Sequence, residues 1–202
     1  MKLKAVVAQI QHESKVVQGE ATRDMTYESH HTYPDESAAR EAFANSTVKL
    51  LNVNGWSALS SLSADFALYD PIGRAKPNIP VEIGDFIQIV LPGPMPENWV
   101  RVIHRQTSDN LAEFTVQPCP DPSANKPDQI EHFFSEEARS TFRVEVSGCT
   151  IHASEIGQHE SINNQQPQAG DRGLVNTVIA EAGWLFYQKI QWKLLTDYLV
   201  HP

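Results

Sequence analysis

The sequence predicts a single α+β domain over residues 1–202, with a curved antiparallel sheet of about six to seven strands packed on a long C-terminal helix. Apolar and polar residues alternate in successive short segments between residues 64 and 160, and short turns join these segments. A broad apolar stripe then follows over residues 171–199. Because a sheet with one apolar face has to cover that face, the C-terminal helix is expected to pack on it.

The first third of the chain predicts a strand followed by a short helix pair. Alternation within residues 3–10 indicates a strand, and the polar remainder of residues 1–34 is expected to form a ribbon or a loop. Asp35 or Ser37 can accept hydrogen bonds from the first turn of a helix. Gly55 is suited to end that helix, and a second short helix is expected from Trp56 onward, so the pair spans residues 35–63.

The central part of the chain predicts the strands of the sheet. The positions expected to face inward are all apolar, whereas general acid–base chemistry needs ionisable groups in such a place. This composition favours a non-catalytic protein over an enzyme. The expected strands cover residues 65–69, 85–91, 99–104, 111–116, 141–146 and 150–160, with a proline-rich loop over 117–130.

The C-terminal stripe predicts a helix that Asp171 caps. About 28 residues at roughly 1.5 Å each would span about 42 Å, which is long enough to cross a sheet. Trp184 and Trp192 of this helix are expected to pack in the core. Because Trp192 lies off the main stripe, it is also a candidate for contact with a protein partner.

Charge and composition limit which classes of partner are expected. A formal net charge of −9 disfavours nucleic acid and anionic lipid, and no apolar run is long enough for membrane insertion. The apolar run at the N-terminus is too short for a signal peptide. Cys119 and Cys149 show no metal-binding or disulfide spacing, which indicates reduced thiols. We therefore expect a cytoplasmic protein without a cofactor.

Several segments together carry a resemblance to a known fold: 39–43 leading to 56–59, then 66–68 and 83–85, and finally 142–145 turning through Ser147 and Gly148 into 150–153. Their order resembles the START-like, or helix-grip, superfamily, which includes polyketide cyclase-like and chaperone-activator-like proteins. The likeness spans most of residues 36–199. It implies that a small apolar ligand is gripped between sheet and helix. If so, we expect a cavity on the order of a few hundred Å3 there.

The candidate ligand-binding residues are those expected to face the helix from the sheet, together with Phe186 on the helix itself. Among them, His104 shares the face of Val100 and Val102 if its strand is regular, and could orient a ligand or act as a general base. The set is Phe66, Leu68, Ile87, Ile89, Val102, His104, Phe114, Phe142, Val144 and Phe186.

No catalytic residue and no metal site is predicted. His152, Glu155, His159 and Glu160 have the chemistry of metal ligands, but the offset of seven places the two histidines on opposite faces of a regular strand. All four are expected to be exposed polar residues of a hairpin.

Three alternatives remain open at this point. An SH3-like barrel around residues 65–117 is a rival fold. An interaction or structural module, acting as a homo-oligomer or with a protein partner, is a rival function, and it predicts an exposed apolar patch around Trp192 and Tyr198. A cyclase or hydrolase that uses His104 is a weaker alternative.

Overall fold

The computed structural model describes residues 11–16, 18–57, 59–61, 63–77, 79–93, 95–124, 128–164, 167–173, 176 and 184–201, with the main chain alone at 168, 171 and 184–186. Seven strands form one antiparallel sheet in the order β1-β7-β6-β5-β4-β3-β2. The strands are β1 (Arg23–Thr32), β2 (Asp65–Tyr69), β3 (Phe86–Val90), β4 (Asn98–Thr107), β5 (Leu111–Pro118), β6 (Arg139–Ser147) and β7 (Thr150–Glu160).

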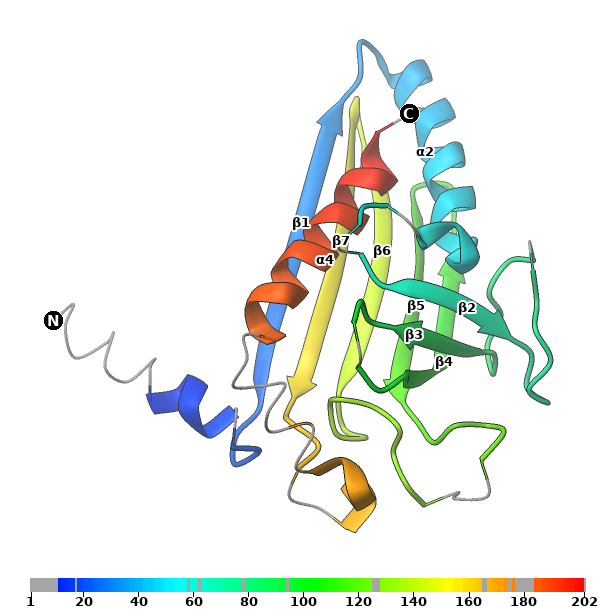
Figure 1. The fold of residues 1–202 in the computed structure, drawn as a ribbon. Coiled ribbons are helices and arrows are strands. Elements are labelled where there is room, and N and C mark those ends of the chain that lie inside the picture. The colour runs from blue at the N-terminus through cyan, green and yellow to red at the C-terminus, as the bar shows by residue number, and fades with distance from the viewer. Residues whose placement is uncertain are drawn as a thin grey trace, which may run out of the picture.

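Two helices lie side by side on the inner face of this sheet (Figure 1). The helix α4 (Trp184–Val200) packs on β1 and β7, and α2 (Glu36–Leu51) packs mainly on β6. The short 3-10 helix η1 (Val53–Trp56) follows α2 and ends at Trp56, whereas the sequence predicts a second helix that begins there. The predicted α+β helix-grip architecture is therefore confirmed.

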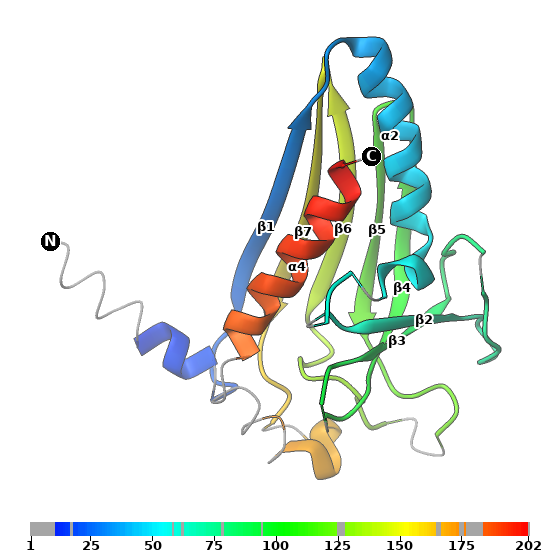
Figure 2. The same cartoon turned by 45° about the horizontal axis from the view of Figure 1, so that its top comes forward.

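The sheet is strongly curved. Figure 2 shows β2 and β3 running across the direction of the long strands β1, β7, β6 and β5. One bulge interrupts β4 between Val102 and His104, and a second irregularity lies where Arg23 and Met25 of β1 meet β7. Each bulge adds a residue to one strand and increases the local twist, which helps the sheet to wrap around the helices.

An aromatic cluster around Trp56 fills the centre of the core. Its side chain is 1 % exposed, and its ring centroid lies 5.5 Å from that of Phe66, 5.7 Å from Phe114 and 4.9 Å from Phe142. The indole Nε1 donates to the carbonyl oxygen of Lys49 at 3.0 Å, so its only polar atom is satisfied. This residue joins the end of α2 to three strands of the sheet.

The C-terminal end of α4 is anchored by side chains from other elements. Because the last carbonyls of a helix have no partner within the helix, they need donors from outside. Ser46 Oγ donates to the Leu199 carbonyl at 2.6 Å, and Tyr33 Oη donates to that of Val200 at 2.8 Å. Lys49 Nζ donates to the His201 carbonyl at 2.6 Å. These bonds fix one end of α4 against α2 and the end of β1.

Several details differ from the sequence-based expectations. The segment 65–117 contributes β2 to β5 of the single sheet, so the rival SH3-like barrel is wrong. Residues 171 and 172 belong to the 3-10 helix η2 (Pro167–Arg172), which bends at Gly170 (φ 51°, ψ −132°), and α4 is described from Trp184. The strand predicted over residues 3–10 lies outside the described residues, whereas residues 11–16 are helical.

No helix in the described part of the chain is long and apolar enough to cross a membrane.

We predict that Ser46→Ala lowers the free energy of unfolding by about 1–3 kcal/mol, because it leaves a buried carbonyl of α4 without its donor. Urea unfolding measures the change. The matched control is Ser37→Ala in the same helix, where the side chain is exposed and the change should stay within about 0.5 kcal/mol. Equal stabilities of the two variants would show that the bond to α4 is unimportant.

Candidate functional site

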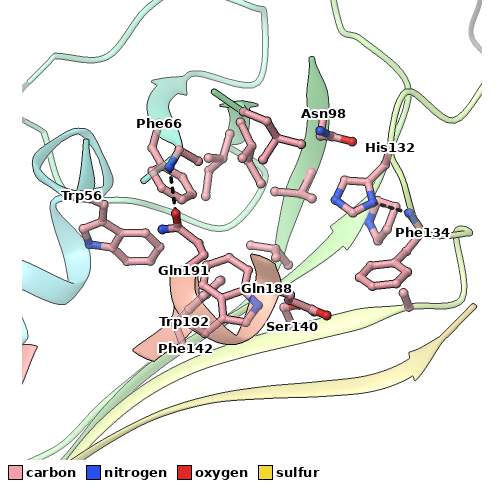
Figure 3. A pocket seen from close by; sticks show the side chains of 18 of the residues that line it. Trp56, Phe66, Asn98, His132, Phe134, Ser140, Phe142, Gln188, Gln191 and Trp192 are labelled. Atoms are coloured by element: carbon pink, nitrogen blue, oxygen red, sulfur yellow. Dashed lines mark hydrogen bonds between the residues drawn. The ribbon is translucent and has the colours of Figure 1, made fainter. Parts of the chain in front are cut away.

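A small pocket lies between the sheet and the first half of the described α4 (Figure 3). It has a volume of about 50 Å3, and its walls are mainly apolar. The lining residues are Trp56, Ala64, Phe66, Ile87, Ile89, Leu91, Asn98, Val100, Val116, Pro118, His132, Phe134, Ala138, Arg139, Ser140, Phe142, Tyr187, Gln188, Gln191 and Trp192.

The volume of the pocket is much smaller than the few hundred Å3 that we predict from the sequence. An engineered apolar cavity of roughly 150 Å3 takes up benzene, and the volume here is about 50 Å3. Side chains such as those of the Trp56 cluster occupy the remaining space between sheet and helices. A bound molecule of more than a few atoms would therefore have to displace some of the lining side chains.

The structure brings only part of the predicted ligand-binding set to this pocket. Phe66 of β2, Ile87 and Ile89 of β3, and Phe142 of β6 line it. Four others are buried in the core without lining the pocket: Leu68, Val102, Phe114 and Val144. Phe186 lies in α4, but its side chain is outside the described residues. Contact of the four lining residues with a ligand stays a prediction.

His104 does not face the pocket. The bulge between Val102 and His104 adds one residue to β4, so His104 pairs with Thr115 and lies on the outer face of the sheet. Its side chain is 51 % exposed, and Nε2 lies 3.5 Å from Glu113 Oε1. The expectation that His104 shares the face of Val100 and Val102 is wrong because the strand is irregular there. A molecule held between sheet and helix cannot reach this imidazole.

A buried histidine that the sequence did not single out closes one end of the pocket. His132 Nδ1 accepts from the main-chain N–H of Phe134 at 2.9 Å. Burial, aided by the positive charge of Arg172, lowers the pKa of His132 to about 3. The imidazole is therefore neutral near pH 7, and its proton is on Nε2 because Nδ1 is an acceptor.

Asparagine side chains hold the loop that carries His132. Asn163 Nδ2 donates to the carbonyl of His132 at 3.2 Å, and Asn176 Nδ2 donates to that of Asn163 at 2.7 Å. Asn98 Oδ1 accepts from the main-chain N–H of Phe133 at 2.9 Å. The carbonyl and the N–H of the peptide group that follows His132 are thus both held by asparagine side chains.

A buried polar cluster lies next to the pocket, beneath α4. Arg23 Nε of β1 lies 2.9 Å from Glu160 Oε2 of β7, and Gln188 Nε2 of α4 donates to Glu160 Oε1 at 2.7 Å. Arg23 Nη2 in turn donates to Gln188 Oε1. All three side chains are at least nine-tenths buried. The three residues form a closed ring of bonds that joins β1, β7 and α4.

Glu155 belongs to the same region. It is fully buried on β7, where its cross-strand neighbours are Tyr27 of β1 and Phe142 of β6. Burial, and to a smaller extent the charge of Glu160, holds the pKa of Glu155 well above its usual range. Burial also raises the pKa of Glu160, although Arg23 and Gln188 oppose that effect. One positive charge thus lies near two carboxyl groups, and Arg23 is paired with Glu160 rather than with Glu155.

A bulge in β7 places Glu160 on the same face as Glu155, although their odd spacing would put them on opposite faces of a regular strand. Arg23 pairs with Glu160 while Met25 pairs with Gly157, so β7 carries one extra residue there. His159 adopts a φ of 53° within this bulge. Gly157 makes room for the carboxylate, since a Cβ at that position would lie 2.5 Å from Glu160 Oε1.

The predicted exposure of these two carboxylates is wrong. Glu155 and Glu160 were expected to be exposed, and both are fully buried. The alternation of Ile151, Ala153 and Glu155 did carry a signal for Glu155, because residues two apart share a face of a strand. No comparable signal existed for Glu160, whose direction depends on the bulge.

The apolar patch predicted around Trp192 and Tyr198 is also not found. Both side chains are half-buried and pack against the core. The Trp192 ring meets Phe142 edge-on at 5.3 Å between centroids, and Tyr198 lies under Lys49, whose Nζ is 4.9 Å from the ring centroid. Trp192 thus belongs to the pocket wall.

No family model and no curated protein matches this sequence. The chain is similar in structure to a hypothetical protein from Helicobacter pylori, at 12 % identity and a TM-score of 0.49, with 92 % of each chain covered. It is also similar to ginseng major latex-like protein 151 from Panax ginseng, at 8 % identity and a TM-score of 0.40, with 80 % of this chain and 97 % of the other covered. Norcoclaurine synthase from Thalictrum flavum gives 9 % identity, a TM-score of 0.39 and 92 % coverage of each chain. These likenesses concern the path of the chain, and they assign no ligand or activity to it.

We predict that Glu155→Gln stabilises the protein at pH 8 by on the order of 1 kcal/mol, or about 2–4 °C in Tm for a chain of this size. With the folded-state pKa of Glu155 raised, the folded chain keeps a proton that the unfolded chain releases above about pH 4.3, so stability falls as pH rises from there toward the folded-state pKa. Glutamine mimics the protonated acid and removes this loss.

Thermal unfolding between pH 4 and pH 8 measures the effect, which should vanish toward pH 4. The control is Glu145→Gln, an exposed position on β6, for which no pH-dependent gain is expected. A uniform loss of stability in Glu155→Gln at every pH would contradict the protonated state.

We predict that Arg23→Met lowers the free energy of unfolding by about 3–5 kcal/mol, since it leaves Glu160 buried without its cation. Chemical denaturation at pH 7 measures the change, with Arg74→Met as the exposed control. A variant as stable as the control would mean that Glu160 is held neutral without Arg23.

Proposed function

We propose that this chain binds a small, largely apolar molecule between the inner face of the sheet and α4, without acting on it chemically. The observation that carries the proposal is the mainly apolar pocket where α4 meets β2, β3 and β6. Its volume of about 50 Å3 means that the molecule is accommodated by displacement of lining side chains such as Ile89 and Tyr187, which are only half-buried.

The absence of catalysis is part of the proposal. Glu155 is a buried acid, yet it is not among the residues that line the pocket, and His104 lies on the other face of the sheet. The ionisable group that closes the pocket is His132, whose low pKa makes it a weak base near pH 7. These positions support binding rather than proton transfer.

Toluene tests the proposal, because it is purely apolar and carries no hydrogen-bonding group. Amide chemical shifts recorded by NMR during a toluene titration should change for residues of β2, β3 and the first half of α4. Ala138→Leu adds bulk inside the pocket and should weaken toluene binding at least about tenfold, since filling a packed space forces neighbours off their preferred positions.

Ala124→Leu is the matched control, because Ala124 is exposed in a turn outside the pocket. Shifts scattered over the surface, or unchanged toluene binding in a folded Ala138→Leu, would refute the proposed site.

A further inference from the structure

Gln191 presents a free amide donor to the pocket. Its side chain is 3 % exposed, and its Oε1 accepts from the main-chain N–H of Ala64 at 2.8 Å, which fixes the amide against β2 (Figure 3). Within the described part of the chain, its Nε2 has no hydrogen-bond partner. A buried donor without a partner is costly, so an acceptor at this position would be stabilising.

Trp192 supplies a second donor from the next position of α4. Its ring lines the pocket, and its Nε1 is buried without a hydrogen-bond partner among the residues that the structure describes. Trp56, which also lines the pocket, shows the usual arrangement instead, since its Nε1 donates to Lys49. The difference between the two indoles makes Trp192 Nε1 available to a bound molecule.

His132 supplies a third donor at another part of the wall. Its Nδ1 is engaged with Phe134, which leaves the proton on Nε2 of a ring that lines the pocket.

The amide oxygens of the pocket wall are already engaged. Gln191 Oε1 accepts from Ala64, and Gln188 Oε1 accepts from Arg23. Asn98 Oδ1 accepts from Phe133 and, at 3.3 Å, from Arg172 Nη2. A molecule that brings donors would therefore compete with bonds of the fold, whereas one that brings acceptors meets donors without partners.

Two of the positive charges near the pocket are paired with carboxylates. Arg23 and Arg172 are paired with Glu160 and Glu131. Arg139 lines the pocket, but its Nη1 donates to the carbonyls of Glu136 and Ala138, each at 2.7 Å. An anion entering this mainly apolar space would lose its hydration, and the cation it could meet is the guanidinium of Arg139, whose Nη1 is already held by two carbonyls.

From these observations we propose that the ligand is an uncharged, mainly apolar molecule with a hydrogen-bond acceptor, such as the carbonyl oxygen of an aromatic ketone, and that Gln191 and Trp192 donate to this acceptor. The inference rests on the proposed function, because it names the chemical class of the molecule bound in the same pocket. The aromatic side chains of Phe66, Phe134 and Phe142 provide flat apolar walls for its ring.

Three compounds of similar shape separate the possibilities: ethylbenzene, which has no acceptor, acetophenone, which has a carbonyl, and benzoate, which is an anion. Dissociation constants come from NMR titration of the full chain. Acetophenone should bind at least as tightly as ethylbenzene although its carbonyl is better hydrated, and benzoate should bind at least about tenfold more weakly.

Two variants remove one donor each. Trp192→Phe keeps an aromatic ring and deletes the indole N–H. Gln191→Met deletes the amide donor and also the acceptor of the Ala64 N–H, so its effect is judged from the ratio of its two affinities. Each should weaken acetophenone binding about tenfold while ethylbenzene binding stays within about twofold. The matched control is Trp99→Phe, a buried tryptophan that does not line the pocket, for which all three affinities should be unchanged. Because the two compounds are compared within each variant, a general loss of stability affects both.

The proposal is overturned if benzoate binds more tightly than acetophenone, or if the folded donor variants bind acetophenone as the unaltered chain does. If ethylbenzene binds in the pocket while acetophenone shows no dependence on the donors, the acceptor class is wrong and the proposed function stands. If none of the three compounds binds, the proposed function itself fails, and the inference with it.

Discussion

Arg23 and Glu160 form an ion pair that is withdrawn from water where β1 meets the end of β7, and Gln188 completes it from α4. Burying two charges is unfavourable unless their remaining hydrogen-bonding groups are satisfied, and the amide of Gln188 satisfies one group of each partner. The pair therefore depends on the position of α4 over the sheet, and that position also forms one wall of the pocket. The shape of the pocket and the state of the ion pair are physically linked.

The two ends of α4 are held by different kinds of contact. At its C-terminal end, the side chains of Tyr33 and Ser46 donate hydrogen bonds to main-chain carbonyls, so the helix is held there through its backbone. Around residues 188–192 the helix is held by side chains. Gln188 bonds to Glu160 and Arg23, and Gln191 accepts a hydrogen bond from the main-chain N–H of Ala64. The pocket lies in this second region, where a substitution changes both packing and polarity. This division places the part of α4 that could select a ligand away from the part that anchors it.

Much of the fold could be predicted because it follows from periodicity. The alternation of Phe142, Val144 and Val146 identified the inner face of β6, and the stripe of the last helix identified what covers it. The site could not be predicted to the same extent, because it depends on departures from periodicity. A bulge turns His104 outward and another turns Glu160 inward, and neither has a local sequence signal. His132 lies in a loop, where no repeat indicates burial.

Two tryptophans lie in the wall of the pocket, where their fluorescence depends on what the pocket contains. Of the four tryptophans of the protein, Trp56 and Trp192 line the pocket, whereas Trp99 lies buried outside it. Indole emission depends on the polarity around the ring, and it shifts to longer wavelength when the excited ring is in contact with polar groups. A molecule bound in the pocket would change the surroundings of Trp56 and Trp192, while those of Trp99 would stay the same. Occupation of the pocket would therefore shift the emission maximum of Trp56 and Trp192.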